Sequence, residues 1–290
     1  MELNTDYILE KQLEPNPGVL YIVGTPIGNL EDFSPRAKNI LSKVSIIACE
    51  DTRHSGQLLK RFKIKASLIS FHKHNFHARI PKLLEALKKG ETLAIVSDAG
   101  LPSISDPGEE LVSASRTIGH KVVCIPGPCA AITALVSSGL PAQRFCFEGF
   151  IPTKSKLRKA LLNTIAKEQR TTIIYEAPHR ILQLLKELSL LCGEERPIQV
   201  AKELTKRHEE QIGPTIGKAL EYFLENKPRG EFTLVLGGAP PEEMNHIRDE
   251  ELIEAMQQLI SNGASTNFAA KELASKTPYS KNYLYSLMHK

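Results

Sequence analysis

Three loops rich in glycine and proline are the segments of this sequence best suited to hold a small ligand. They read GTPIGNL (24–30), SDAGLPSISDPG (97–108) and PGPCAA (126–131), and each follows a short run of aliphatic residues. Ligands bind at the carboxyl ends of strands in open α/β sheets, so three such loops predict a pocket rather than three plain turns. None has the P-loop sequence GxxxxGK[ST] or the spacing GxGxxG, which disfavours a nucleoside triphosphatase and an ordinary dinucleotide site.

Positive charge is concentrated in two segments of the chain. Residues 52–90 contain ten lysines and arginines against Glu85, and residues 153–170 contain six against Glu168, although the net charge is only +4. This segregation predicts a face that binds a polyanion, because lysine and arginine release counterions from a phosphate backbone; the alternative is two solvated helix faces. Aromatic side chains between the bases of the first segment could stack on unpaired RNA bases: His54, Phe62, Phe71, His72, His74 and His77.

The cysteines and histidines do not have the spacing of a metal site. The five cysteines include no CxxC pair and four lie in apolar runs, which predicts buried, reduced thiols. Zinc would need cysteine and histidine clustered at ligand spacing. We therefore expect no metal.

The sequence also lacks the signals of a membrane or secreted protein. No segment reaches the roughly 18 uninterrupted apolar residues that a membrane-spanning helix needs. The first residues, MELNTDYILEKQLEPNPG, have neither the basic nor the apolar region of a secretory signal. We expect a cytoplasmic protein that binds no membrane.

Length and patterning predict an α/β fold. A chain of 290 residues with 41% hydrophobic content is too long for a small stapled module and too apolar for a disordered chain. Short β-branched runs alternate with helical patterns through the first 240 residues, as in α/β proteins. Strands are expected at 19–24, 45–49, 67–71, 92–97, 121–125, 144–149, 171–175, 197–201, 209–213 and 231–236. Helices are expected after the Ser34-Pro35 cap and over 108–118, 156–166, 180–191 and 215–224.

The segment after Pro240-Pro241 has a different pattern. An apolar stripe over 252–260 predicts a helix, Ser265-Thr266 would cap a second, and a third would follow TPYS. Three short helices resemble a helix-turn-helix unit, and the alternative is a plain packing appendage. We expect an N-terminal extension (1–17), an α/β domain with the three loops and the basic segment (18–139), a second α/β domain (140–239) and a helical tail (240–290).

Seven motifs, taken in order, resemble the tetrapyrrole methylase family, and most closely its branch that methylates bacterial ribosomal RNA. They are VGTPIGNL, CEDTRHS, SDAGLPSISDPG, PGPxA, YEAPHR, AKELTKRHE and GEFTLVLGG, and they extend from about residue 18 to 240. The resemblance implies two α/β domains of the tetrapyrrole methylase type with a small helical extension, in a homodimer. It also implies S-adenosyl-L-methionine-dependent 2′-O-methylation of a cytidine in the decoding region of 16S ribosomal RNA, with the small ribosomal subunit as partner and no role for DNA.

The motif positions that match the family imply where the methyl donor binds. It would lie between the two domains, where small side chains permit close approach of the backbone. The implied contacts are Ile27, Val96, Ser97, Asp98, Leu101, Cys129, Ala130, Glu176, Ala177 and Leu204, with Gly230 as a further candidate. Asp98 could accept hydrogen bonds from the ribose hydroxyls or offset the sulfonium charge; the alternative is a turn-stabilising aspartate.

Methyl transfer to a ribose hydroxyl requires that the hydroxyl be aligned and lose its proton. Candidate groups lie in CEDTRH, YEAPHR and AKELTK: Glu50, Asp51, Arg53, His54, Glu176, His179, Arg180, Lys202, Glu203 and Lys206. We expect Glu50, Arg53, Glu203 and Lys206 to line the ribose site. For each of the candidate groups, and for Arg53 and Arg180 in particular, the alternative is an ion-pair network that holds loops.

Three other functions use the same fold. The acceptor could be a tetrapyrrole or a protein, as in other branches of the family, although neither needs two strongly basic segments. The chain could also be a noncatalytic RNA-binding protein of ribosome assembly that keeps the cofactor fold only as a scaffold. The complete glycine loops count against that role.

Overall fold

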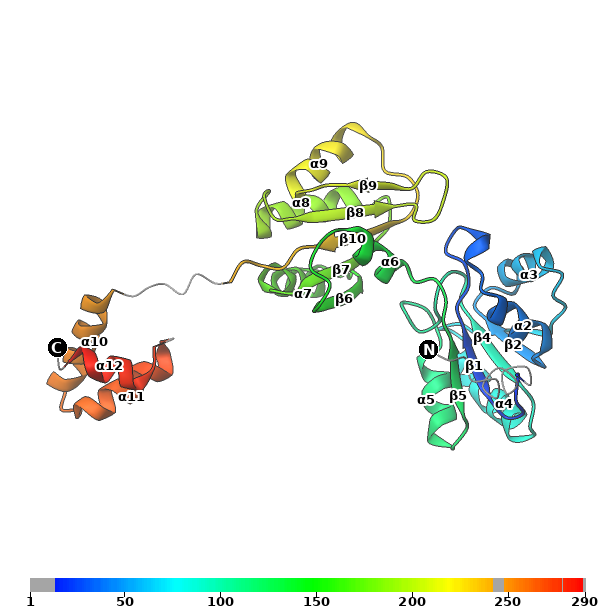
Figure 1. Ribbon diagram of the computed structural model, residues 1–290, viewed down its shortest axis with the longest axis horizontal. Helices are drawn as coiled ribbons and strands as arrows, with labels where there is room; N and C mark the ends of the chain where they lie inside the picture. The colour runs from blue at the N-terminus through cyan, green and yellow to red at the C-terminus, as the bar shows by residue number, and fades with distance from the viewer. Residues whose placement is uncertain (1–13, 242–247, 278, 289–290) are drawn as a thin grey trace, which may run out of the picture. The chain divides into compact units, whose positions relative to one another are not determined.

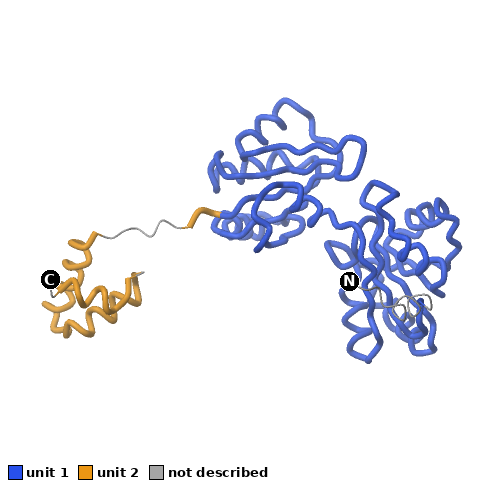
Figure 2. Tube along the Cα trace, in the orientation of Figure 1, with its two compact units in different colours: residues 1–238 blue, residues 239–290 orange. Residues whose placement is uncertain are grey.

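The computed structural model describes residues 14–241, 248–277 and 279–288. The chain divides into two compact units, one up to Gly238 and one from Ala239 onward (Figure 2). Most of the expected N-terminal extension lies outside the described residues. From its described end, the Glu14 carboxylate binds the Arg36 guanidinium at 2.8 Å.

The first sheet has five parallel strands in the order β3-β2-β4-β1-β5, of which β1, β2, β4 and β5 are labelled in Figure 1. They are β1 (Leu20–Val23), β2 (Ile46–Cys49), β3 (Leu68–Ser70), β4 (Leu93–Val96) and β5 (Val122–Ile125), and all five confirm predicted strands. The central strand β4 is buried along its whole length, as expected for a parallel sheet covered on both faces. Helices α2 (Pro35–Lys43) and α3 (Thr52–Arg61) cover one face, and α4 (Phe76–Lys88) and α5 (Glu109–Thr117) cover the other.

The local signals for these helices are partly visible in the sequence. Ser34 caps α2 as predicted, since its hydroxyl accepts a hydrogen bond from the Ala37 amide at 3.0 Å. Helices α3 and α4 have no counterpart among the predicted elements. In α4 the interior Pro81 disfavours a helix, yet Leu83 and Leu87 pack into the core. Tertiary burial outweighs the local preference there.

The second sheet, also in the first unit, has the order β6-β7-β10-β8-β9 and mixes parallel with antiparallel pairs. Its strands, all predicted, are β6 (Phe145–Phe150), β7 (Thr171–Glu176), β8 (Ile198–Lys202), β9 (Glu210–Ile212) and β10 (Phe232–Leu236). Helices α7 (Ser155–Lys167), α8 (Ile181–Cys192) and α9 (Ile216–Glu225) pack on one face. Helix α6 (Ala130–Ser137), which was not predicted, packs on the other. Thus α6 follows the third loop of the first sheet but covers the second sheet, and links the two.

The second unit contains α10 (Asp249–Ser261), α11 (Thr266–Lys276) and α12 (Lys281–Leu287), in agreement with the three predicted helices. Ser265 and Ser280 cap α11 and α12. The helices enclose a small apolar core of Leu252, Met256, Ala269, Ala270, Leu284 and Leu287. Within the described residues, no helix of either unit is long and apolar enough to span a bilayer.

The cysteines are free, as predicted, but the prediction that they are buried is largely wrong. Only Cys49 is buried, while Cys124 is exposed. Cys124 lies on β5, at the edge of the first sheet, so a side chain in an apolar run can still face outward there.

Candidate functional site

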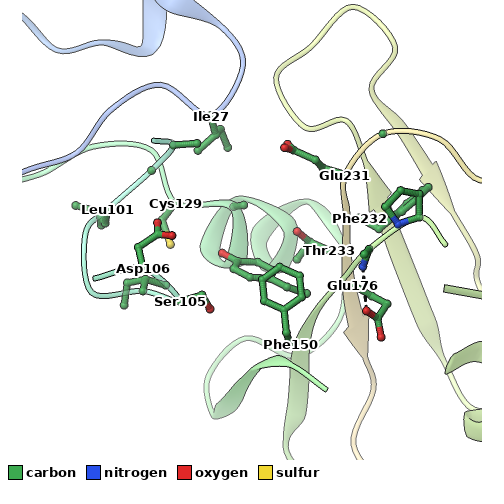
Figure 3. A pocket seen from close by; sticks show the side chains of 18 residues that line it. Ile27, Leu101, Ser105, Asp106, Cys129, Phe150, Glu176, Glu231, Phe232 and Thr233 are labelled. Carbon is green, nitrogen blue, oxygen red and sulfur yellow. Dashed lines mark hydrogen bonds between the residues drawn. The ribbon is translucent and has the colours of Figure 1, made fainter. Parts of the chain in front are cut away.

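A cavity of about 350 Å³ lies between the two sheets of the first unit (Figure 3). One wall comes from loops at the carboxyl ends of the first sheet and includes Leu101, Asp106 and Cys129. The opposite wall comes from the ends of β6, β7 and β10 and includes Phe150 and Glu176. The volume is in the range of small-molecule sites.

The three predicted loops converge beside this cavity. Thr25 and Gly100 exchange backbone hydrogen bonds of 2.9 and 3.2 Å, which join the first loop to the second. Gly24 and Gly127 touch backbone to backbone, which joins the first loop to the third. Strand order explains this convergence, because β4 and β5 flank β1 and all three strands end at the same edge.

Most of the residues expected to bind the cofactor lie in or behind the cavity wall. Those that line it are Ile27, Leu101, Cys129, Ala130, Glu176 and Ala177, together with the further candidate Gly230. Val96 and Ser97 are buried at the end of β4. Leu204 is buried against Ile27 in the same apolar cluster, and supports the wall from behind.

Asp98 lies apart from this lining. It borders a shallow depression with Glu50, Arg53, His72, Lys73 and His74, where β2, β3 and β4 end. The Asp98 carboxylate accepts a hydrogen bond from the Asp51 amide at 3.4 Å. The Arg53 guanidinium is 2.8 Å from the Asp51 carboxylate, and this hydrogen-bonded pair holds the pKa of Asp51 far below its ordinary value.

The other two residues expected at the ribose site form an ion-pair cluster. Lys206 Nζ lies 2.9 Å from both Glu203 Oε1 and Glu231 Oε2. Burial opposes ionisation of Glu203, but hydrogen bonds from Lys206 and from the Glu231 amide outweigh it and lower its pKa. Burial likewise opposes the charge of Lys206, yet the two carboxylates raise its pKa. Glu203 borders a second depression with Arg207 and Arg229, separate from the one that Glu50 and Arg53 border.

Two residues of the cavity wall that the sequence analysis missed have raised pKa values. Burial raises the pKa of Asp106 to about 6; the charges of Glu50 and Asp98 act in the same direction, against the Ser97 hydroxyl. Burial also raises the pKa of Tyr175, whose hydroxyl accepts a hydrogen bond from the Ala131 amide at 3.0 Å. The only sequence signal for Asp106 is its place in the second loop, where an aspartate before proline is typical of a turn.

Glu176 lines the cavity and is nevertheless buried. Its Oε1 lies 3.2 Å from Arg180 Nε and accepts a hydrogen bond from the Ala177 amide at 2.9 Å. Its Oε2 lies 3.9 Å from an Arg158 nitrogen, and Arg158 Nε donates to Glu187 at 2.9 Å. Two guanidinium groups therefore fix the turn that follows β7, which is the alternative role considered for Arg180.

The structure corrects two details of the predicted polyanion-binding face. Arg158 was predicted to belong to this face, but it is only 7% exposed and therefore does not contribute to it. Phe71 is buried, so its ring is not available for stacking on bases, and Phe62 is partly buried against Phe33, with ring centres 5.1 Å apart. In contrast, nine of the ten bases of residues 52–90 are exposed, as are His54, His74 and His77.

Comparison with known proteins shows the family to which the chain is related. The family described as Tetrapyrrole (Corrin/Porphyrin) Methylases matches residues 19–220. The chain is 48% identical over 270 residues to the ribosomal RNA small subunit methyltransferase I of Synechocystis sp., covering 93% of this chain and 97% of that protein. It is 46% identical to the protein of that name from Haemophilus influenzae, over 92% and 95% of the two chains.

Among solved structures, the fold is similar to uroporphyrin-III C-methyltransferase from Thermus thermophilus in complex with S-adenyl homocysteine. The TM-score is 0.52 at 17% identity, over 76% of this chain and 96% of that chain. At this identity the similarity concerns the fold alone.

Proposed function

The chain belongs to the tetrapyrrole methylase family, and from this premise we propose that it transfers a methyl group from S-adenosylmethionine to the 2′-hydroxyl of a cytidine in the decoding region of 16S ribosomal RNA. The observation that carries the proposal is the convergence of all three glycine-rich loops beside one cavity between the sheets. The relatives are named for methylation of small-subunit ribosomal RNA, which supports RNA as the acceptor.

The residues of the cavity fit S-adenosylmethionine. Ile27 and Leu101 offer apolar surface to an adenine ring, and Ala130 and Ala177 leave room for close approach. Asp106 and Glu231 bring carboxylates to the lining, which suits a ligand that carries a sulfonium charge. S-adenosylmethionine supplies a methyl group that is already activated by the positive sulfur.

The protein's own part in the reaction is to position the methyl donor and the acceptor hydroxyl, and to exclude water. The Thr25–Gly100 pairing and the Gly24–Gly127 contact hold the three loops in one arrangement. From the opposite wall, the Glu176–Ala177 turn is fixed by Arg158 and Arg180. Alignment of a hydroxyl with a fixed methyl group can account for several kcal/mol of the barrier, about 7–11 in favourable cases.

The exposed bases of residues 52–90 support RNA as substrate. Lys60, Lys63 and Lys65 border a depression with an apolar floor, and Lys73 borders the depression near Asp98. Such side chains would bind phosphates in a sequence-independent way and orient the RNA toward the cavity. A small tetrapyrrole would not require this face. In this proposal the partner is the small ribosomal subunit, and the protein acts in the cytoplasm as a homodimer.

The test is methyl transfer to small ribosomal subunits from cells that lack this modification. Labelled S-adenosylmethionine is the donor, and nuclease digestion followed by mass spectrometry identifies the product. We expect 2′-O-methylcytidine. Label on a base, or on a protein or tetrapyrrole acceptor instead of RNA, would overturn the proposal.

A matched pair of variants ties the activity to the cavity. Ala177→Phe places a ring in the cavity wall, while Ala160→Phe places the same ring on an exposed position of α7. We expect Ala177→Phe to abolish both cofactor binding and transfer, and Ala160→Phe to retain both.

A further inference from the structure

The residues expected at the ribose site do not include a good proton acceptor. Arg53 stays protonated at any physiological pH. Lys206 is held as a cation between two carboxylates, and the pKa of Glu203 is lowered by the same cluster. Glu50 borders the shallow depression rather than the cavity. Loss of the hydroxyl proton therefore requires another group.

Asp106 is in a suitable place. It lies on the loop between β4 and α5 and lines the cavity on the same wall as Leu101 and Cys129 (Figure 3). Its carboxylate is half-buried, and Tyr175 of the second sheet is within its electrostatic range. The Asp106 carboxylate therefore borders the cavity in which we propose that the methyl donor binds.

The surroundings of Asp106 make it more basic than an ordinary aspartate. The charged groups near it are Glu50 and Asp98, both acidic, while the Ser97 hydroxyl gives partial compensation. Burial and these charges bring its pKa to about 6. It is thus ionised at neutral pH and still binds a proton more readily than an exposed aspartate, as a general base should.

The backbone around Asp106 is held in an unusual conformation. Ser103 and Ser105 have φ angles of 72° and 64°, in the left-handed region that non-glycine residues rarely adopt. A Cβ at Gly108 would lie 2.5 Å from Ser103 Oγ, so the loop closes tightly after Asp106. Such strain is found where surrounding structure fixes a functional group.

We propose that Asp106 accepts the proton of the ribose hydroxyl during methyl transfer. The hydroxyl oxygen forms a bond to the methyl carbon, and the carbon–sulfur bond breaks with its electron pair left on sulfur. The O–H proton passes to a carboxylate oxygen of Asp106 and leaves later to water. This inference rests on the proposed function, since it requires a hydroxyl acceptor.

Kinetics of Asp106→Asn test the inference. Asparagine keeps the shape of the side chain but cannot accept the proton, so we expect kcat to fall about 10²–10⁴-fold. Binding of S-adenosylhomocysteine, measured by calorimetry, should change less than about threefold. Glu195→Gln removes an exposed carboxylate outside the cavity lining and should match the unaltered protein in both respects.

The pH profile and a titration without substrate give independent readouts. The activity of the unaltered protein should rise as the pH increases through about 6. Asp106→Glu should show a similar rise of activity with pH, but with a lower kcat. The carboxyl carbon of Asp106, observed by NMR in the free protein, should titrate near the same value and at lower pH in Glu50→Gln.

The outcomes separate this inference from the proposed function. If the unaltered protein does not methylate RNA, the proposed function fails. If it does and Asp106→Asn keeps its kcat, Asp106 is not the proton acceptor. A large loss of S-adenosylhomocysteine binding in Asp106→Asn would also overturn the inference, because Asp106 would then hold the cofactor.

Discussion

Gly24 and Gly127 meet so closely that neither has room for a side chain. A Cβ on Gly24 would lie 2.7 Å from the Cα of Gly127, and a Cβ on Gly127 would lie 2.8 Å from the Cα of Gly24. Real Cβ contacts essentially never fall below 3.0 Å. The first and third loops can therefore converge beside the cavity only because both positions are glycine.

Replacing Gly127 with alanine should separate these loops. We expect the free energy of unfolding to fall by about 1–3 kcal/mol, as for other overpacked sites. Binding of S-adenosylmethionine should weaken as well, since Ile27 and Cys129 lie on the two loops that move apart. Urea unfolding and calorimetry measure the two effects.

Gly56→Ala is the matched control. Gly56 lies in α3, and among the described residues an added Cβ would meet only Leu68, at an ordinary distance of 3.6 Å. Alanine favours a helix over glycine by about 0.5–1 kcal/mol, so this variant should be slightly more stable. If Gly127→Ala is as stable as Gly56→Ala, the backbone contact does not matter.

The sequence predicts the strands and the place of the cavity better than the chemistry of its wall. All ten strands overlap segments that the sequence predicts as strands, and the convergence of the loops follows from their position after strands. Asp106 could not be singled out this way. Its raised pKa depends on burial and on the charges of Glu50 and Asp98. Asp98 belongs to the same loop after β4, but Glu50 follows β2, and no local pattern indicates the burial of Asp106 or the approach of Glu50.

Arg158 is a second residue whose role could not be predicted from the sequence. In the sequence it is one of six bases in a polar segment, and nothing local separates it from Lys159. In the fold, α7 turns Arg158 toward α8 and β7, where Glu187 and Glu176 lie. Its role is thus set by helix packing rather than by composition.

Arg158→Ala should be strongly destabilising. Removal of one partner from a buried ion pair leaves the other charges uncompensated, at a cost of about 3–5 kcal/mol. Glu176 would lose one of its two guanidinium neighbours, so cofactor binding should also weaken. Lys159→Ala, on the exposed side of the same helix, should change stability by less than about 0.5 kcal/mol. Equal stability of the two variants, measured by urea unfolding, would contradict the role given to Arg158.

The exposed bases near α3 predict how binding to the small ribosomal subunit depends on salt concentration. Among the described residues, those that border the depression by α3 include Lys60, Lys63 and Lys65 and no acid. Each phosphate contact contributes about 0.7–0.9 to the slope of log affinity against log salt. The triple alanine variant should therefore bind the small subunit more weakly and with a slope smaller by about two, while its kcat at saturation is retained.

A second triple variant controls for net charge. Lys121, Lys218 and Lys227 are exposed and lie outside residues 52–90, and their replacement by alanine removes the same charge. Filter binding at several salt concentrations should give a slope close to that of the unaltered protein. If both triple variants lower the slope equally, binding follows overall charge, and the face by α3 has no special part.

Asp106 should reduce the stability of the protein at neutral pH, and this is the most direct physical consequence of its surroundings. Its pKa of about 6 in the folded state lies above the ordinary 3.8, so the folded protein binds this proton more tightly than the unfolded chain does. The free energy of unfolding must then fall as pH rises between these two values, and the loss remains at higher pH. An asparagine side chain at this position would carry no charge and would avoid the penalty.

Asp106→Asn should therefore be more stable than the unaltered protein at pH 7, by about 1–2 kcal/mol once solvent screening of this partly exposed group is included. The difference should shrink as pH falls and vanish below about pH 4, where the aspartate is protonated in both states. Urea unfolding between pH 3.5 and 7.5 measures it, and Glu195→Gln should show no such trend. A variant that loses activity and gains stability would separate a functional role for Asp106 from a structural one, whereas equal or lower stability at pH 7 would mean that the carboxylate is not destabilised in the fold.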